Sequence, residues 1–236
     1  MRFKAVTFDC YGTLIDWDTG IGDWFAGWAR QRGAAVDVDR MRGLFAEAQR
    51  RRQAELPFTP YRRILAEALA DAATALGMAI AEEDKAAFAG SASAWPPFAD
   101  TLPALAALKE QGRTLGVMSN IDADLFAGTA GLLENRINIV VTADQVQSYK
   151  PRHAHFAEMR RRLEEREIGR DAILHVAQSR FHDIAPANAL GWANCWVDRR
   201  RGRSGRGVTV ASQAMADHEV TSMAGLIALL ESIDPA

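Results

Sequence analysis

Four short segments of this 236-residue chain carry side chains that can attack or bind an anionic substrate. Asp9 supplies a carboxylate that can attack an electrophilic centre and form a covalent ester or acyl phosphate, which divides one difficult step into two. Lys150 can keep Asp9 ionised, because an opposite charge within ~4–6 Å favours the carboxylate. Ser119 and Asn120 offer hydrogen-bond donors to an anion, and Asp183 adds a second carboxylate. These residue types are compatible with a hydrolase that uses an aspartate nucleophile.

The candidate residues follow predicted strands or lie in loops between them. Lys4–Phe8, Thr114–Met118 and Ala172–Ala177 are short, apolar and rich in strand formers, and each is followed by one of the polar segments. The other expected elements are two strands, Ile137–Val141 and Ala193–Val197, and two amphipathic helices, Thr101–Gln111 and His153–Arg166. Strands that alternate with helices predict a doubly wound parallel α/β sheet with a Rossmann-like core. Ligands of such sheets bind at the carboxyl ends of the strands.

One long region interrupts this alternation. Between about Gly20 and Ser93 the sequence has helical periodicity and no convincing strand, and Trp95-Pro96-Pro97 marks the return to strands and helices. We therefore expect a helical domain inserted after the first strand. The predicted boundaries are residues 1–15 and 96–236 for the α/β core domain and residues 16–95 for the helical cap domain.

The motifs and their order resemble those of the haloacid dehalogenase superfamily. Phe8–Leu14 (FDCYGTL) is similar to its first motif, Ser119-Asn120 to the second, Tyr149-Lys150-Pro151 to the third and the loop that ends at Asp183 to the fourth. The resemblance covers the whole chain, since the inserted helices fall where this superfamily places a cap. It implies that Asp9 is the nucleophile and that Lys150 and Asp183 are catalytic.

Tyr11 distinguishes two branches of the superfamily. Phosphatases have a second aspartate at this position, which protonates the leaving group, and Mg²⁺ neutralises the phosphate. A tyrosine, with a pKa near ~10, replaces such an acid poorly. Asp-x-Tyr-Gly-Thr instead resembles the type II 2-haloacid dehalogenases, in which halide leaves without a proton. The resemblance implies no cofactor and no metal, and it implies substrate-binding roles for five residues: Cys10, Tyr11, Thr13, Ser119 and Asn120.

The chain also departs from the dehalogenase pattern. The fourth motif of that family resembles Ser-x-Asn-x-x-Asp, but Gln178 and Arg180 stand at its first two polar positions. Gln178, Arg180 and His182 are therefore expected near the site, in supporting roles: Arg180 near a bound anion or paired with Asp183, and His182 in proton transfer or orientation. The family places an arginine early in the cap to receive the halide. None of the candidates aligns with it: Arg40, Arg42, Arg50, Arg51 and Arg52.

Composition limits the partners. A net charge of −2 gives no reason to expect nucleic acid or an anionic membrane as partner. The sequence has no signal-peptide pattern and no apolar run of ~18 residues, so we expect a cytoplasmic protein. Its partner is expected to be a small anionic molecule, and the resemblance suggests a homodimer. The basic segment Arg199–Gly207 is interpreted as a solvated surface loop, with anion binding or an interface role as the alternative.

Three other functions stay open at this level. The first is a Mg²⁺-dependent phosphatase that uses Asp9 and Asp183 as ligands. The second is displacement of a group other than halide, as in the opening of a strained cyclic amino acid such as azetidine-2-carboxylate. The third is a binding protein that has kept the fold without catalysis, since fold alone never settles function.

Overall fold

A six-stranded sheet forms the centre of the molecule. The computed structural model describes residues 2–33, 36–202 and 212–234. The strands are β1 (Ala5–Phe8), β2 (Thr114–Ser119), β3 (Ile139–Thr142), β4 (Ile173–Ala177), β5 (Ala193–Val197) and β6 (His218–Val220). They pair in the order β3-β2-β1-β4-β5-β6, and every pair is parallel. The predicted doubly wound parallel sheet is confirmed.

Strand β1 lies at the topological switch point of this sheet. It pairs with β2 on one side and β4 on the other, so that Phe8 is opposite both Val117 and Val176. All four β1 residues are buried, as expected for a central parallel strand of apolar and β-branched residues. Because a crevice forms at the carboxyl ends of the strands at a switch point, Asp9 directly after β1 occupies the position where ligands bind in this class of fold.

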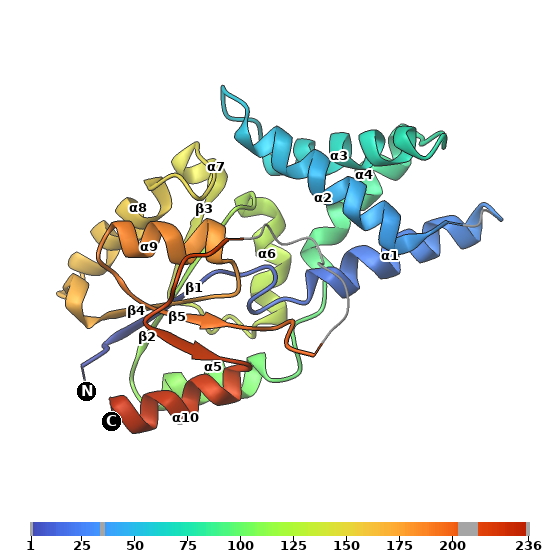
Figure 1. Cartoon of the computed structure of the whole chain (residues 1–236). Coiled ribbons are helices and arrows are strands. Elements are labelled where there is room, and N and C mark those ends of the chain that lie inside the picture. Colours follow the sequence, from blue (N-terminus) through green and yellow to red (C-terminus); the bar gives the residue numbers. More distant parts are fainter. Residues whose placement is uncertain (1, 34–35, 203–211, 235–236) are drawn as a thin grey trace.

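Helices cover both faces of the sheet (Figure 1). One face packs against α5 (Thr101–Glu110) and α10 (Met223–Ile233), and the other against α8 (Ala154–Glu164) and α9 (Ala185–Ala189). Two further helices, α6 (Ala123–Leu132) and α7 (Ala143–Val146), follow β2 and β3. The apolar residues divide accordingly into two clusters, one with Val6 and Leu105 and the other with Ala5 and Phe156.

Four helices between β1 and α5 lie beyond one end of the sheet (Figure 1). They are α1 (Trp17–Gln31), α2 (Val38–Ala54), α3 (Tyr61–Ala75) and α4 (Glu82–Ser91), followed by a short 3₁₀ turn at Ala92–Ala94. We call residues 17–94 the helical segment, and no described residue in it forms a strand. Its centre is aromatic: the Phe88 ring lies 5.3 Å from Phe25 and 5.1 Å from Phe45, measured between centroids. The division into a core and a cap domain at the predicted boundaries stays a prediction.

The helical segment is tied to the strand ends by specific hydrogen bonds. Both carboxylate oxygens of Asp122, the residue before α6, accept backbone N–H groups at the start of α3, from Tyr61 and Arg62, at 2.8 Å each. The Tyr149 hydroxyl donates to the Thr59 carbonyl at 2.6 Å. Arg200 pairs with Asp18 of α1 at 2.6 Å. These contacts fix the helices over the carboxyl ends of the strands.

Two details of the sheet differ from the sequence prediction. β3 begins at Ile139 instead of Ile137. Before it, the Asn138 N–H donates to the Leu115 carbonyl at 2.8 Å, but the Leu115 N–H donates at 2.9 Å to the Asn138 side chain and not to a backbone carbonyl. β6 was not predicted, since it is a three-residue edge strand with two polar residues.

Within the described ranges, none of the helices combines the length and apolar character that crossing a membrane requires.

Candidate active site

The loop after β1 presents Asp9 at the switch point. The Asp9 N–H donates to the Val176 carbonyl at 3.1 Å, and the Cys10 carbonyl then accepts the N–H groups of Leu14 and Ile15 at 2.7 and 3.0 Å. This tight turn requires Gly12, which has a φ of 95°. A Cβ at Gly12 would also lie 3.0 Å from the indole nitrogen of Trp17. A side chain there would therefore disturb both the turn and its neighbour.

Thr13 holds the Asp9 carboxylate in place. Its hydroxyl donates to Asp9 Oδ2 at 2.7 Å and accepts the Gln178 N–H at 2.9 Å. The Thr13 carbonyl accepts two hydrogen bonds from the Arg199 guanidinium, at 3.0 and 2.8 Å, and the same guanidinium contacts Asp100 at 2.8 Å. Arg199 is therefore a buried structural residue, and the interpretation of the basic segment as a solvated loop was wrong for this position. Residues 203–207 of that segment lie outside the described residues.

Lys150 joins the two carboxylates of the site. Its ammonium donates to Asp9 Oδ1 at 2.9 Å, to Asp183 Oδ1 at 2.6 Å and to the Met118 carbonyl at 2.8 Å. The side chain is 1% exposed. Because an ammonium has three N–H donors, these bonds use all of them. Lys150 can thus compensate the charge of Asp9 but must release a partner before it can bind another oxygen.

Burial and charge act in opposite directions on these groups. Burial raises the pKa of Asp9, and the Lys150 charge and the Thr13 hydroxyl oppose that rise without cancelling it. Burial would also raise the pKa of Asp183, but the charge of Lys150 and a hydrogen bond with His175 outweigh it and bring the pKa to about 2. For Lys150, burial lowers the pKa, while the two carboxylates raise it above its ordinary value. The site is therefore built to keep Asp183 and Lys150 charged.

Asp183 is held in a π-helical turn, Arg180–Ile184, a geometry often found at functional sites. His175 lies behind it on β4, with Nε2 3.2 Å from Asp183 Oδ1 and Nδ1 3.0 Å from the Thr7 hydroxyl. The second oxygen of Asp183, Oδ2, is buried and has no hydrogen-bond partner among the described residues. A buried carboxylate oxygen in this state is ready to accept a hydrogen bond from water or substrate.

Ser119 is the last residue of β2 and Asn120 follows it, close to Lys150 as predicted. The side chain of Asn120 is already engaged in hydrogen bonds with the backbone of Lys150. The Asn120 amide donates to the Lys150 carbonyl at 3.1 Å and accepts the Lys150 N–H at 2.7 Å. It is therefore engaged in positioning Lys150. Both residues line the pocket, and the Ser119 carbonyl lies 3.1 Å from Nε2 of the buried His155.

Cys10 and Tyr11 have different environments. The Cys10 side chain is fully buried in the apolar core and does not line the pocket, and a substrate-binding role for Cys10 stays a prediction. Tyr11 does line the pocket, with its hydroxyl 2.6 Å from Thr129 Oγ1. Burial raises the pKa of Tyr11 well above its ordinary value, so that it stays a phenol.

The three residues that were expected in supporting roles differ in whether they line the pocket. Gln178 and His182 line the pocket, whereas Arg180 does not. The Arg180 guanidinium stacks over the Trp196 ring at 3.6 Å and faces Glu219 at 3.4 Å, so the predicted pairing with Asp183 was wrong, and the predicted contact with a bound anion stays a prediction. His182 lies 3.1 Å from the Ser179 hydroxyl, and burial lowers the pKa of His182 to about 4, which keeps it neutral near pH 7.

The helical segment forms the opposite side of the pocket. Its contribution comes from Trp17, Gln49, Gln53 and Tyr61. We call Gln49 and Gln53 the α2 wall, and Asp9, Ser119, Lys150 and Asp183 the core wall. None of the five candidate arginines lines the pocket. Arg42 pairs with Asp39, Arg51 and Arg52 pair with Asp71, and Arg40 and Arg50 are exposed.

The sequence prediction did not include the α2 wall or His175, although each had a detectable signal. Gln49 and Gln53 continue the four-residue spacing of Met41 and Phe45, which are buried in α2. Two amides at positions where the period requires apolar side chains indicate a polar partner. His175 is a polar residue in the middle of a buried strand, which carries the same signal.

The donors present do not fit a metal ion bridging the carboxylates. The positive charge between Asp9 and Asp183 is already supplied by the Lys150 ammonium, which contacts one oxygen of each, and Thr13 holds the second oxygen of Asp9. Tyr11 replaces the additional acid of the phosphatases. Elsewhere in the described part of the chain, no group of three or more histidine, cysteine, aspartate or glutamate side chains is arranged to hold a metal. We therefore derive no step through a metal.

With this geometry established, comparison with known proteins gives the family. A profile of haloacid dehalogenase-like hydrolases matches residues 3–191. The chain belongs to this family and is a hydrolase, as predicted. It is also similar to the (S)-2-haloacid dehalogenase of Pseudomonas sp. strain YL, with 25% identity over 97% of this chain and 95% of that protein.

Solved structures show the same fold. The L-2-haloacid dehalogenase of Xanthobacter autotrophicus with chloropropionic acid covalently bound superposes with a TM-score of 0.82 and 20% identity, covering 98% of this chain and 99% of that chain. A magnesium-bound haloacid dehalogenase-type hydrolase from Bacillus subtilis has a TM-score of 0.77 at 13% identity, covering 98% and 100%. Fold similarity thus extends to a dehalogenase and to a magnesium-bound hydrolase alike, and the fold alone does not choose between these activities.

Proposed function

We propose that this hydrolase displaces a leaving group, halide in the first instance, from C2 of a small carboxylic acid through a covalent ester on Asp9. The observation that carries the proposal is the position of Lys150, whose ammonium lies between Asp9 and Asp183. The similarity to (S)-2-haloacid dehalogenases adds support. In this proposal the helical segment acts as a cap over the carboxyl ends of the strands.

The first step forms one bond and breaks one. An Asp9 carboxylate oxygen attacks C2, and the carbon–halogen bond breaks as halide takes the electron pair. Halide leaves without a proton, so the acid that Tyr11 replaces is unnecessary. Thr13 and Lys150, which hold the two Asp9 oxygens, orient the carboxylate for attack.

The second step hydrolyses the ester. Water attacks the carbonyl carbon of the Asp9 ester, which regenerates the carboxylate and releases a 2-hydroxy acid and one proton. Asp183 Oδ2 is buried and unpaired among the described residues, and it is available to accept a hydrogen bond from that water. We assign Asp183 the role of orienting the water, since its pKa of about 2 makes it a weak base.

The charges at the site disfavour the phosphatase alternative. Lys150 is the only lysine or arginine among the pocket-lining residues that the structure describes, and two carboxylates already share it. A phosphoryl group would bring more negative charge to this site than the single carboxylate of a 2-haloacid does. Opening of azetidine-2-carboxylate remains compatible with the same attack, because its ring nitrogen carries its own proton. Homodimer formation stays a prediction.

Halide release tests the proposal directly. We expect the enzyme to release chloride from L-2-chloropropionate, and to do so equally with and without EDTA. Phosphate release from phosphate esters and ring opening of azetidine-2-carboxylate are measured in parallel. Activity on phosphate esters that is lost in EDTA and restored by Mg²⁺ would show the dehalogenase assignment to be wrong. Ring opening without any halide release would keep the Asp9 attack and replace the leaving group.

A further inference from the structure

One face of α2 changes character along its length. Met41, Phe45, Gln49 and Gln53 recur every fourth residue and are all buried. Side chains at this spacing share a helix face. The first two pack in the apolar core, where Phe45 contacts the rings of Phe25 and Phe88. The last two line the pocket opposite Asp9. The same face therefore packs the helical segment at one end and lines the pocket at the other.

Gln49 has a hydrogen-bonding capacity that the protein does not satisfy. The residue is 8% exposed, and its Oε1 atom is buried without a hydrogen-bond partner among the described residues. A buried acceptor without a hydrogen-bond donor destabilises the folded protein. Buried polar atoms in folded proteins are otherwise nearly always paired. An unpaired amide oxygen on a residue that lines the pocket thus points to a ligand that supplies a donor.

The side chains of the α2 wall are uncharged, and this limits which ligand group can donate a hydrogen bond to Gln49. It contributes amides to the pocket, and the arginines of the same helix lie outside it. A halide ion is only an acceptor, so it gains nothing from the Gln49 oxygen. A hydroxyl group gives a proton to such an oxygen and can also accept one from an amide N–H. Two amides one helical turn apart can pair with both functions of a single hydroxyl.

We infer that Gln49 and Gln53 determine specificity by binding a hydrogen-bond-donating substituent, such as a hydroxyl, next to C2 of the substrate. The inference rests on the proposed function and names its substrate class: 2-substituted acids with a polar group on C3 are preferred over plain 2-haloalkanoates. A site that hydrogen-bonds a substrate hydroxyl discriminates strongly against the analogue without it, because its buried polar groups are then unpaired.

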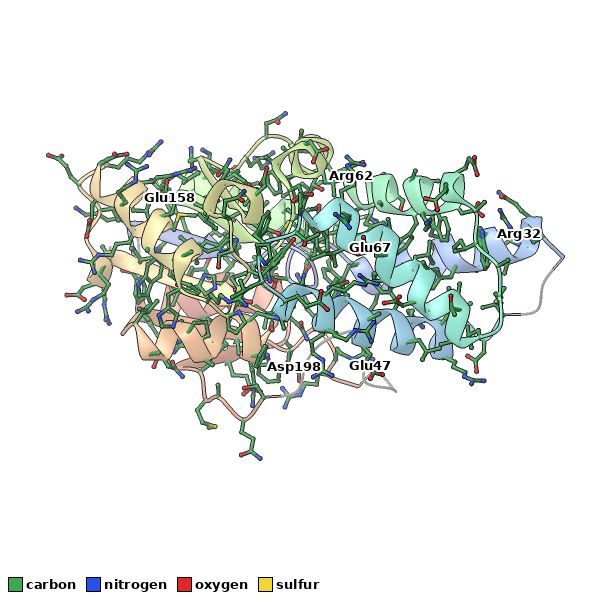
Figure 2. The ribbon with its side chains drawn as sticks, turned by 90° about the horizontal axis from the view of Figure 1, so that it is seen from above. Arg32, Glu47, Arg62, Glu67, Glu158 and Asp198 are labelled. Atoms are coloured by element: carbon green, nitrogen blue, oxygen red, sulfur yellow. The ribbon has the colours of Figure 1, made fainter. Side chains whose placement is uncertain are left out.

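Two acids of nearly equal size test this inference. In 2-chloro-3-hydroxypropionate a hydroxyl replaces the terminal methyl of 2-chlorobutanoate. We expect the wild-type kcat/KM, followed by chloride release, to favour the hydroxy acid by about tenfold or more. Gln49→Met should reduce that ratio to near one, and Gln53→Met should reduce it less. Glu47→Met is the matched control, because Glu47 is exposed on the outer side of the same helix (Figure 2).

The outcomes separate this inference from the proposed function. Chloride release without preference for the hydroxy acid, or a preference that Gln49→Met leaves unchanged, overturns the inference and leaves the proposed function intact. If neither acid releases chloride, the proposed function fails. Calorimetric binding of the same two acids to Asp9→Asn, with and without Gln49→Met, then decides the inference independently of turnover. Tighter binding of the hydroxy acid that depends on Gln49 supports it, and equal binding overturns it.

Discussion

The core wall of the pocket is charged and leaves one carboxylate oxygen, Asp183 Oδ2, without a partner among the described residues, whereas the α2 wall is neutral and leaves an amide oxygen without one. On the core wall, Lys150 uses its three donors on Asp9, Asp183 and a backbone carbonyl. On the α2 wall, Gln49 Oε1 has no partner in the described part of the protein. Groups that are completely satisfied have fixed positions, and groups that are not satisfied are available to a ligand.

We interpret the core wall as the part of the pocket that carries out the reaction and the α2 wall as the part that recognises the substrate. The core wall follows from strand ends, which a parallel sheet brings to one edge whatever the substrate. The α2 wall belongs to an inserted segment whose side chains can vary without affecting the nucleophile. Substitutions in the core wall should therefore impair every substrate, while substitutions in the α2 wall should change the ranking of substrates.

Replacement of the nucleophile should have the largest effect. Asp9→Asn should lower kcat by roughly 10³-fold or more on every acid, because an amide is too weak a nucleophile to form the ester. Circular dichroism should show a folded protein, and Asp124→Asn, at an exposed position, serves as control. During multiple turnovers in heavy-oxygen water, mass spectrometry of the wild type should find the label in Asp9. Label that enters only the product, in a single turnover with excess enzyme, would indicate direct attack by water.

Removal of the buried cation should come next. In Lys150→Met, Asp9 and Asp183 lose their common partner, and loss of one member of a buried ion pair costs about 3–5 kcal/mol of stability. One carboxylate should then retain a proton, so the acid limb of kcat/KM should move to higher pH. Lys109→Met, at an exposed lysine, should leave the profile unchanged. An acid limb that stays in place would show that Lys150 does not keep Asp9 ionised.

The connection between the two walls can be weakened separately. Asp122 accepts two backbone N–H groups at the start of α3, as an N-capping residue does. Asp122→Ala should lower the free energy of unfolding by about 0.5–2 kcal/mol, measured by denaturant titration. Asp124→Ala removes an exposed pair with Arg62 and should cost less, about 0–1 kcal/mol. Equal losses would mean that Asp122 does not secure the helical segment.

Half of the core wall could be predicted from strand ends, while Lys150 and Asp183 lie further along the loops and were predicted from the resemblance of their motifs. Asp9 and Ser119 follow runs of apolar strand formers, and a parallel sheet places such positions together. The short polar strand β6 carries no such signal, so it was missed. Arg180 shows a different limit: whether a guanidinium turns to Asp183 or to a tryptophan face depends on Trp196, a contact between distant parts of the chain.

The α2 wall could not be predicted for a related reason. Periodicity shows that Gln49 and Gln53 share a face with Phe45, but it does not show which neighbour that face meets. The answer depends on how the helical segment sits on the strand ends, which contacts such as Asp122 with α3 determine. Sequence patterns thus predict the helices and strands and the face of each that is buried. Which buried face lines the pocket depends on tertiary contacts.

The smallest expected effect concerns how the free energy of unfolding depends on pH through His155, a residue behind the core wall. His155 is fully buried behind Ser119, with Nε2 3.1 Å from its carbonyl. Burial lowers the pKa of His155 from 6.5 to about 3. The unfolded chain therefore binds a proton at this histidine as the pH falls below 6.5, while the folded protein does not bind one until about pH 3. The free energy of unfolding should accordingly decrease as the pH falls through this window.

Denaturant titrations at pH 8 and pH 6 measure this contribution. Between these values His155 should account for about 1 kcal/mol of lost stability, and His155→Gln should remove that part of the pH dependence. Glutamine retains an N–H that can donate to the Ser119 carbonyl but does not titrate. His153→Gln is the matched control, since His153 is exposed just before the same helix. If the difference in stability between His155→Gln and the wild type is the same at both pH values, His155 is protonated equally in both states. The Gln49→Met variant should keep the full pH dependence, because the α2 wall is neutral and carries no titratable group.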